Sequence, residues 1–399
     1  MSATASLSIT TDIGLKPGTI PASFFGISSI GPTNWPTASF GAFGKGGETT
    51  WPYLEPVKGQ FNWTRLDAFV AGAQAHGTTM FWVNHDVPQW AAADPTTCTT
   101  PYNTEICTSM VANIADWDDF CTALVQRYKG QILMYELWNE PDTPDFTGTL
   151  ADMVELTQHL YNAVRANDPN ALIASPSGLD PSWMASYFAA GGPTGVDIVG
   201  THGYVENFGN QPESLEQGKA TAWHPMMLQY GLANKPIWDT EGSWGLDTAA
   251  GLDADARAAF LARFYLLHWS AGITKFYWYA WDSSTWGTLS SSGTPNKAGL
   301  AYTQVYNWMT GATMPQACTA QGTVYSCPLT RPNGYNALAV WDSAKTCTTA
   351  GGCDTSSYTA PPSFTQYQDL TGAVTAIQSG QIISIGAKPI LLETNSINP

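Results

Sequence analysis

Short apolar runs alternate with amphipathic helical stretches between about residues 24 and 310. Helical spacing is clear where Leu66, Phe69, Val70 and Ala73 share one face. Eight alternations over roughly 290 residues predict a (β/α)8 TIM barrel, an α/β fold. A doubly wound open sheet is the alternative, but no glycine-rich phosphate fingerprint follows the first strand. The predicted strands are Phe24–Ile30, a weak one near Thr49–Leu54, Thr79–Asn84, Ile132–Trp138, Ala171–Ser175, Asp197–His202, Pro236–Thr240 and Thr274–Ala280.

The helical period disappears past about residue 312, where short β-type runs are broken by Gly, Pro and Ser. The alternating segment Ser6–Thr10 is expected to join these runs as an extra strand of a β-sandwich. We therefore divide the chain into an N-terminal strand (1–19), a catalytic barrel (20–311) and a C-terminal β-sandwich (312–399). The β-type runs are Tyr335–Trp341, Phe364–Tyr367, Ala373–Ile377, Gln381–Ile385 and Pro389–Leu392.

Charge and composition narrow the class of partner. Lys and Arg total 16 against 32 Asp and Glu, so the formal net charge is −16. An acidic chain is a poor ligand for nucleic acid or for an anionic membrane face. No apolar run approaches the ~20 residues that a membrane-spanning helix needs. The 44% of hydrophobic residues, with 17 Trp and 17 Tyr, are ample for a large core.

Six of the seven cysteines fall into three close pairs, which are Cys98 with Cys107, Cys318 with Cys327, and Cys347 with Cys353. Their spacing predicts three small loop disulfides made in an oxidising compartment. Zinc ligation is the alternative, but no pair has two-residue spacing and no histidine couple stands nearby. Cys121 lies on the apolar face of a predicted helix and is expected to be a buried thiol.

The opening Met1–Leu7 has neither the basic start nor the apolar core of a signal peptide. Together with the predicted disulfides, this favours a mature exported chain whose leader has been removed. We expect a secreted location, extracellular or periplasmic.

Two predicted strands end in a glutamate. The fourth strand is followed by Trp138-Asn139-Glu140-Pro141, and the seventh ends in Thr240-Glu241-Gly242. In a barrel, the carboxyl ends of the strands converge on one face, so these two side chains are expected to meet across the rim. A pair of carboxyl groups, one protonated and one ionised, is what cleavage of a glycosidic bond requires.

These two motifs closely resemble those of clan A glycoside hydrolases over roughly residues 20–310. The segment Trp51–Asp67 and the sixth-strand Thr201–Tyr204 point, within the clan, toward family 39. The resemblance implies that Glu140 is the general acid/base, Glu241 the nucleophile, and Asn139 the partner of the sugar 2-hydroxyl. It also implies a retaining double displacement. Inversion with the same residues is an alternative that the separation of the two carboxyl groups decides.

The chain departs from the clan where relatives carry an arginine near the end of the second strand, because Gly44-Lys45-Gly46-Gly47 stands there. Either Lys45 takes the place of that arginine, or His202 and Tyr204 orient the nucleophile instead. Glu136 lies on the same strand face as Glu140 but about 13 Å deeper. We interpret Glu136 as a buried structural carboxyl group.

Further polar and aromatic residues follow the predicted strands at the same rim. His85 after the third strand, and His202 and Tyr204 after the sixth, could hold sugar hydroxyls, and Tyr204 could also hold Glu241. Aromatic rings bind the C–H faces of sugars, and after the eighth strand Trp281 is the preferred platform, with Trp286 close behind. The alternative role for each of these aromatic residues is packing in the hydrophobic core.

The sequence therefore predicts a secreted retaining glycoside hydrolase that acts on plant or microbial poly- or oligosaccharides. The alternative is a non-catalytic carbohydrate-binding protein on a degenerate barrel. No metal or cofactor is expected, since no two of the six histidines have metal-binding helical spacing and no EF-hand pattern occurs. The pattern specifies neither the sugar nor the oligomeric state.

Overall fold

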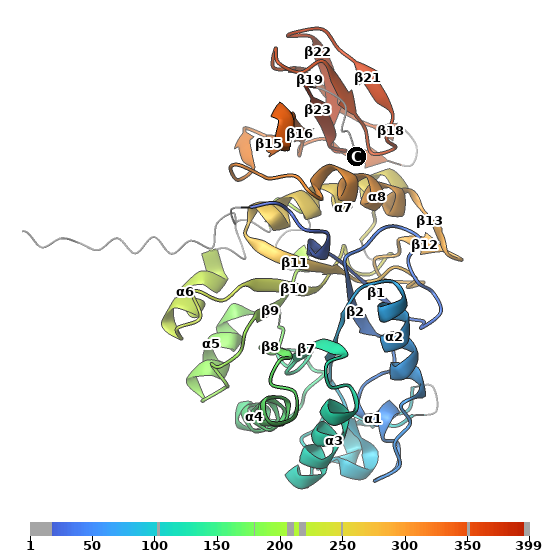
Figure 1. Cartoon of the computed structure of the whole chain (residues 1–399), viewed down its shortest axis with the longest axis vertical. Coiled ribbons are helices and arrows are strands. Elements are labelled where there is room, and N and C mark those ends of the chain that lie inside the picture. Colours follow the sequence, from blue (N-terminus) through green and yellow to red (C-terminus); the bar gives the residue numbers. More distant parts are fainter. Residues whose placement is uncertain are drawn as a thin grey trace, which may run out of the picture.

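The computed structural model describes residues 18–101, 104–178, 180–205, 211–214, 221–248, 250–348 and 352–394. The predicted strand Ser6–Thr10 lies outside the described residues. Figure 1 shows a barrel that carries most of the helices, with a β-rich region against one side of it.

Eight parallel strands form the barrel, in the spatial order β8-β7-β3-β2-β1-β11-β10-β9. A parallel bridge between Ala174 and Ile198 joins the last strand to the first and nearly closes the ring. The predicted α/β barrel is therefore confirmed. The strands are β1 (Phe25–Ser29), β2 (Ala42–Gly46), β3 (Met80–Val83), β7 (Ile132–Glu136), β8 (Leu172–Ala174), β9 (Val199–His202), β10 (Ile237–Gly242) and β11 (Ile273–Trp278).

Helices surround the barrel, and several begin at side chains that suit a helix start. Thr149 and Asp152 form a reciprocal capping box that satisfies free backbone donors at the first turn of α4. The Asp253 carboxylate accepts from two backbone N–H groups at the start of α7. The α-helices are α1 (Trp51–Leu54), α2 (Thr64–Ala75), α3 (Ile114–Arg127), α4 (Leu150–Asn167), α5 (Pro181–Ala189), α6 (Thr221–Gln229), α7 (Ala254–Ser270) and α8 (Lys297–Met309).

The prediction for the second strand is wrong. Residues near Thr49–Leu54 include the short helix α1, and the strand is the glycine-rich β2. A Cβ atom on Gly44 would lie 2.1 Å from the Oγ of Ser28, and one on Gly46 would lie 2.4 Å from the ring of Phe69. These positions therefore need glycine for close packing. The same glycines remove the β-branched signal by which a strand is recognised.

Apolar side chains fill much of the inside of the barrel below the strand ends. One cluster joins side chains from neighbouring strands, including Phe81, Met134, Trp238 and Tyr277. The larger core lies between the strands and the helices and contains the free thiol of Cys121, as expected. Burial raises the pKa of that thiol well above its usual range, so it is protonated and inert.

The C-terminal region contains a six-stranded antiparallel sheet in the order β14-β15-β16-β23-β20-β21, and a second pair of strands, β19 and β22. Apolar side chains from both, including Val340, Phe364 and Ile385, form one cluster. This arrangement is consistent with the predicted β-sandwich. The strands are β14 (Thr319–Gln321), β15 (Val324–Thr330), β16 (Asn336–Asp342), β19 (Thr355–Thr359), β20 (Gln366–Gln368), β21 (Val374–Ala376), β22 (Ile382–Gly386) and β23 (Ile390–Glu393).

Short elements complete the described chain and contain two of the three predicted disulfides, while the other involves Cys327 of β15. Each disulfide joins its predicted pair, at Cys98–Cys107, Cys318–Cys327 and Cys347–Cys353. The first links two strands of a small sheet after β3. The short elements are β4 (Val87–Pro88), β5 (Cys98–Thr99), β6 (Ile106–Cys107), β12 (Ser290–Ser291), β13 (Thr294–Pro295), β17 (Cys347–Thr348), β18 (Gly352–Cys353), and the 3-10 helices Ala22–Phe24, Gln89–Ala91, Pro95–Thr97 and Pro332–Gly334.

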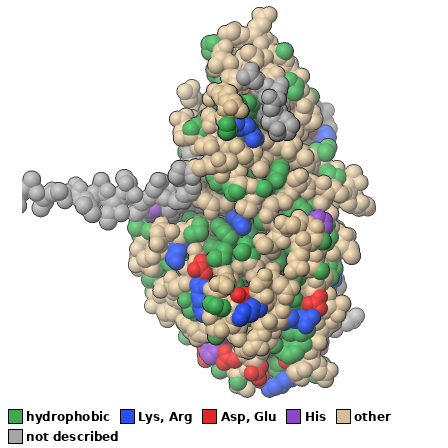
Figure 2. Space-filling model, in the orientation of Figure 1, with side chains coloured by type: hydrophobic (Ala, Val, Ile, Leu, Met, Phe, Trp, Pro, Cys, Tyr) green, Lys and Arg blue, Asp and Glu red, His purple; other side chains and the backbone are tan. Residues whose placement is uncertain are grey.

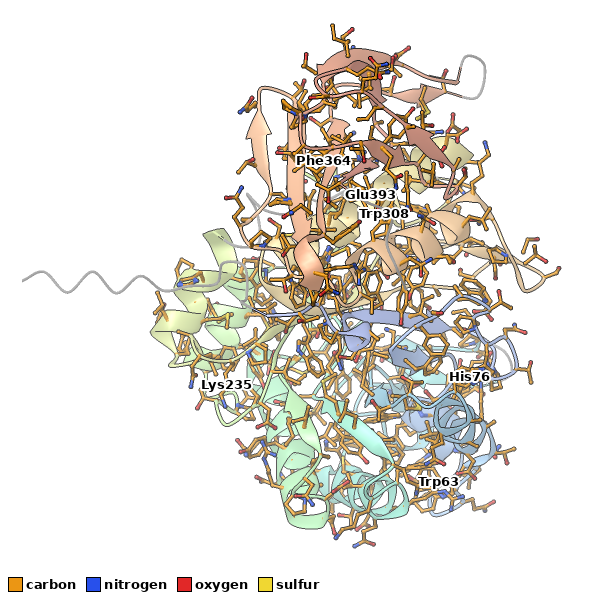
Figure 3. All side chains as sticks on the ribbon, turned by 45° about the horizontal axis from the view of Figure 1, so that its top comes forward. Trp63, His76, Lys235, Trp308, Phe364 and Glu393 are labelled. Atoms are coloured by element: carbon orange, nitrogen blue, oxygen red, sulfur yellow. A yellow bond between two sulfur atoms is a disulfide. The ribbon has the colours of Figure 1, made fainter. Side chains whose placement is uncertain are left out.

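Helices α7 and α8 lie between the barrel and the C-terminal sheets (Figure 1). Trp308 of α8, labelled in Figure 3, donates through its indole N–H to Gln368 of β20. Lys388 pairs with Asp255 of α7 at 3.1 Å. These contacts hold the two regions together, while the residue boundaries that we assigned to them stay a prediction.

The face drawn in Figure 2 carries few charged side chains, in keeping with a chain in which only 12% of residues are charged. None of the described helices combines the length and the apolar character needed to span a membrane.

Close packing at β2 leads to a first prediction. Gly46→Ala should lower the free energy of unfolding by about 1–3 kcal/mol, because the new methyl group overlaps the ring of Phe69. Phe69→Leu in the same chain removes the overlapped ring atoms, so the double variant should be less destabilised than the sum of the single variants. Denaturant unfolding of all four proteins measures this coupling. Strictly additive losses would contradict the packing described here.

Candidate active site

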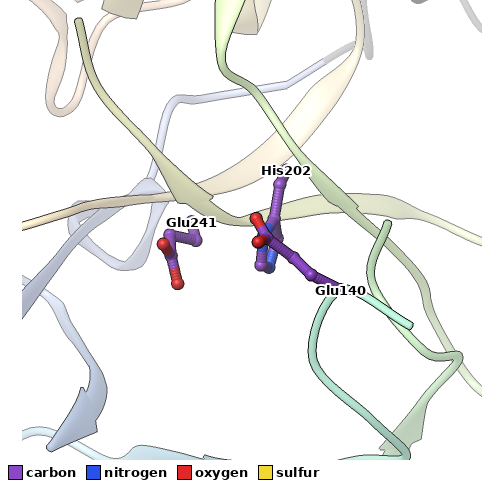
Figure 4. A group of neighbouring side chains, drawn as sticks. All are labelled: Glu140, His202 and Glu241. Carbon is purple, nitrogen blue, oxygen red and sulfur yellow. The ribbon is translucent and has the colours of Figure 1, made fainter. Parts of the chain in front are cut away.

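The two predicted glutamates meet at the carboxyl ends of the barrel strands. Glu241 belongs to β10, and Glu140 follows the end of β7 by four residues. His202, at the end of β9, stands beside them (Figure 4). One side-chain oxygen of each glutamate and one ring nitrogen of His202 all lie within 4.8 Å of one another. The rim therefore brings two carboxyl groups to one small space, as the sequence indicated.

Glu241 is almost completely buried and is held by two donors. Its Oε2 pairs with the Lys45 ammonium, and its Oε1 accepts from the Tyr204 hydroxyl at 2.7 Å. Burial alone raises the pKa of this carboxyl group. The positive charges of Lys45 and His202, with the hydrogen bonds from Lys45 and Tyr204, outweigh that effect and lower the pKa to about 2. Glu241 is thus a carboxylate throughout the physiological pH range.

Lys45 of β2 occupies the position that the resemblance assigned to an arginine. Its ammonium contacts Glu241 and also donates to the Oδ1 of Asn139 at 2.6 Å. Burial lowers the pKa of this lysine, but the negative charge of Glu241 more than compensates and leaves the pKa above its usual value. The sequence left open whether Lys45 or Tyr204 contacts Glu241, and in the structure both side chains do so.

The backbone of Glu140 adopts an unusual conformation that directs its side chain. Its φ is 43°, in the left-handed region that costs a non-glycine residue roughly 1–2 kcal/mol. The Glu140 N–H donates to the carbonyl of Ser177 at 2.7 Å, and its carbonyl accepts from Thr143. These bonds hold the strained residue in place. Its Oε1 lies 2.6 Å from the Nδ1 of His202.

His202 lies between the glutamate at the rim and a second one below it. Its Nδ1 contacts Glu140, and its Nε2 lies 4.0 Å from the Oε1 of Glu136. Burial lowers the pKa of His202, while the charges of Glu140 and Glu241 more than reverse this and raise it. Glu136 is fully buried, and burial raises its pKa to about 7. The polar groups around this carboxyl group are His202, Thr240, Ser177 and Lys45, below the two glutamates of the rim.

Two of the predicted aromatic residues differ sharply in position. Trp286 is partly exposed, and its indole N–H donates to the Tyr204 hydroxyl at 2.9 Å. Trp281 is fully buried and presents no ring face to solvent, so its choice as the sugar platform is wrong. The strand pattern could not reveal this, because Trp281 lies three residues beyond the end of β11 at Trp278, where the alternation of strand side chains no longer applies.

The sequence analysis missed Tyr279, which lies one residue past β11 and is partly exposed. The Lys45 ammonium lies 5.5 Å from the centre of its ring. Burial, followed by the charge of Glu241, raises the pKa of this phenol to about 12. The run of aromatic residues Phe276–Trp281 indicates that an aromatic ring lies at this rim. It does not indicate which of these rings faces the site.

His85 stands on the loop after β3, and its Nδ1 lies 2.9 Å from the Oδ1 of Asp86. The neighbouring Asn84 carbonyl accepts from the N–H of Asn139 at 3.0 Å, so this loop borders the site. His85 itself is partly exposed at that rim.

The group of Glu140, His202 and Glu241 has ligand atoms close enough to hold a cation. However, the Lys45 ammonium already lies against the Oε2 of Glu241 and supplies a positive charge. The donors around the site thus favour ionised carboxylate chemistry over metal ligation.

The chain was compared with protein families and with solved structures. Residues 48–284, more than half of the chain, match the family model described as Cellulase (glycosyl hydrolase family 5). A family 39 glycoside hydrolase from Bacteroides cellulosilyticus WH2 is similar in structure, with a TM-score of 0.73 and 17% identity over 93% of this chain and 80% of that one. A family 39 β-xylosidase from Caulobacter crescentus gives a TM-score of 0.65 and 15% identity over 95% and 97%.

A glucosidase from Croceicoccus marinus has the same fold, with a TM-score of 0.62 and 13% identity over 96% of this chain and 97% of that one. Families 5 and 39 both belong to clan A, so the expected clan is confirmed. Within it, the matching family model is that of family 5, whereas family 39 occurs among the similar folds. The chain therefore belongs to the cellulase family, glycosyl hydrolase family 5, and is a glycoside hydrolase.

Proposed function

We propose that this protein is a retaining hydrolase that cleaves poly- or oligosaccharides by double displacement, with Glu241 as nucleophile and Glu140 as acid/base. The observation that carries the proposal is the separation of the two side chains, since an oxygen of one lies within 4.8 Å of an oxygen of the other. Retaining enzymes hold their carboxyl groups about 5–5.5 Å apart. Inverting enzymes need about 6.5–9.5 Å to admit a water molecule.

In the first step, a Glu241 oxygen attacks the anomeric carbon while the bond from that carbon to the leaving oxygen breaks. Glu140 gives its proton to the leaving oxygen, and a covalent glycosyl ester forms on Glu241. The low pKa of Glu241 keeps its attacking oxygen ionised. The short contact between Glu140 and His202 supports the proton transfer, because one proton can be shared between their facing atoms.

In the second step, Glu140 acts as a base and takes a proton from water. The water oxygen bonds to the anomeric carbon, and the bond to Glu241 breaks, which restores both carboxyl groups. The ester carries no charge, so Lys45 loses its ion pair with Glu241 in this intermediate and keeps Asn139 as an acceptor. We assign Asn139 to the sugar 2-hydroxyl.

The remaining rim residues are assigned to the substrate. His85, His202 and Tyr204 supply hydrogen-bonding groups, and the partly exposed ring of Trp286 supplies an apolar face. The family description and the neighbouring xylosidase and glucosidase support a plant or microbial glycan as substrate. Three disulfides support action outside the cytoplasm, where such bonds persist.

Stereochemistry and labelling test the proposal directly. Proton NMR of freshly cleaved aryl β-cellobioside or β-xylobioside should show the product with the anomeric configuration of the substrate. Glu241→Ala should lower kcat by on the order of 10⁴-fold or more, because the attacking atom is lost. Exposed Glu155 on α4 provides the control, and Glu155→Ala should retain wild-type rates. An inverted product would contradict the double displacement.

Lys45 is expected to determine how kcat/KM depends on pH at the acidic end. Lys45→Met removes the charge that lowers the pKa of Glu241, so that pKa should rise and a smaller fraction should be ionised at low pH. The acidic limb of kcat/KM should therefore move to higher pH. Lys45→Arg retains the charge and should leave the limb near its wild-type position. An unmoved acidic limb in Lys45→Met would contradict the role given to Lys45.

The acid/base role predicts a dependence on the leaving group. Glu140→Gln keeps the shape of the side chain but has no proton to donate. It should hydrolyse glycosides of poor leaving groups at least 10²-fold more slowly, and form the glycosyl-enzyme from dinitrophenyl glycosides at close to the wild-type rate. Pre-steady-state release of dinitrophenol separates this first step from the second. An equal loss on both kinds of substrate would count against Glu140 as the acid.

A further inference from the structure

A one-residue irregularity in β10 determines where Glu241 points. In the pairing of β10 with β9, Asp239 lies opposite Thr201, but Glu241 lies opposite the next residue, His202. One residue, Thr240, is therefore extra on β10, and the pairing with β11 shifts over the same stretch. Such a bulge changes the direction of the side chains that follow it.

The bulge separates two acidic side chains that a regular strand would place on one face. Successive strand residues alternate, so Asp239 and Glu241 would point the same way without it. Instead, the Asp239 carboxylate contacts His268 on α7, outside the barrel, while Glu241 contacts Lys45 and Tyr204 at the site. Thr240 faces inward and its hydroxyl lies 2.9 Å from that of Ser177. The bulge is thus the reason that Glu241 reaches the rim.

Asp239 holds the backbone at this bulge from behind. Its Oδ1 accepts from the N–H of Gly203 at 2.9 Å, and the same N–H contacts the carbonyl of Glu241 at 2.9 Å. Gly203 stands between His202, the partner of Glu140, and Tyr204, the partner of Glu241. A Cβ atom on Gly203 would lie 1.7 Å from the Oδ2 of Asp239, so the carboxylate fills the space that only glycine leaves.

His268 holds the Asp239 carboxylate in its position. Its Nδ1 lies 2.7 Å from the carbonyl of Phe264, which can only accept, so Nδ1 carries a hydrogen. Its Nε2 lies 2.7 Å from the Oδ2 of Asp239. The ring stacks on Phe276 with 4.0 Å between centroids, and both Asp239 and His268 are fully buried. The imidazole has no freedom to turn away.

We infer that the buried Asp239–His268 pair is a positioning device that locks the bulge of β10 and the Gly203 peptide, and so aims Glu241 at the anomeric carbon. This inference rests on the proposed role of Glu241 as nucleophile. Neither Asp239 nor His268 touches the space between the two glutamates. They act through the Gly203 N–H and the backbone of β10.

Hydrogen bonding makes the inference testable with matched variants. In Asp239→Asn, the amide oxygen still accepts from Gly203 and the amide N–H donates to the Nε2 of a neutral His268, so every bond is replaced. Asp239→Leu has a similar volume and makes none of them. We expect the asparagine variant to retain activity within a few-fold of wild type. The leucine variant should lose on the order of 10²-fold in kcat with little change in KM, because a misplacement of about 1 Å has that effect.

The probes are the 2,4-dinitrophenyl 2-deoxy-2-fluoro-β-glycosides of glucose, xylose and cellobiose, with the one that labels wild type fastest used throughout. The burst of dinitrophenol counts folded, competent sites, and the rate constant is then taken per site. A purely structural role would reduce the burst and leave this rate constant unchanged. Peptide mapping identifies the labelled residue.

Two further proteins complete the experiment. Tyr187→Phe removes a buried hydrogen bond of 2.7 Å to Thr157, away from the site, and should label at the wild-type rate per site. His268→Phe retains the stacked ring but not the bond to Asp239, and should label about 10-fold more slowly, which tests the inference even where Asp239→Leu does not fold.

Labels on a residue other than Glu241 in wild type would refute the proposed function. Glu241 labelled at the wild-type rate in Asp239→Leu or His268→Phe would refute the positioning role alone, as would an asparagine variant as slow as the leucine one.

Discussion

The site depends on keeping one carboxylate ionised in a place from which water is largely excluded. A buried negative charge is unfavourable unless opposite charge and hydrogen-bond donors replace its hydration. Glu241 receives both, from Lys45 of β2 and from Tyr204, which follows the end of β9. Much of the local architecture serves to bring these two groups to its oxygens.

The glycines of β2 are one part of that architecture. Gly44 and Gly46 flank Lys45 and allow β2 to approach Ser28 and Phe69 more closely than any side chain would permit. The lysine is thereby set among packed neighbours, with little exposure of its own. A flexible side chain in such a setting loses less entropy when it forms its ion pair, because packing has already restricted it. A lysine can thus supply the charge at this position.

The sequence predicted the parts of this structure that repeat and missed those that depend on local exceptions. Seven of the eight barrel strands, the C-terminal β-structure and the disulfide pairs follow from periodicity and spacing. Strand β2 did not, since its glycines have no side chains to form a pattern. The sequence placed Glu241 at a strand end, but the bulge that turns it inward depends on pairing with β9. Burial of Trp281 likewise depends on the path of the chain beyond β11.

The environments of the two glutamates differ in a way that matches the roles proposed for them. Glu241 has a cation and a phenol against its two oxygens, and both donate, so this side chain is stabilised as an anion. Glu140 has the imidazole of His202 against one oxygen, and an imidazole can either give or take a proton. Fixed donors suit a group that must stay ionised until it attacks. A neighbour that exchanges protons suits a group that must lose one in the first step and regain it in the second. The surroundings of each carboxyl group thus support the proposed assignment of Glu140 as the acid and Glu241 as the nucleophile.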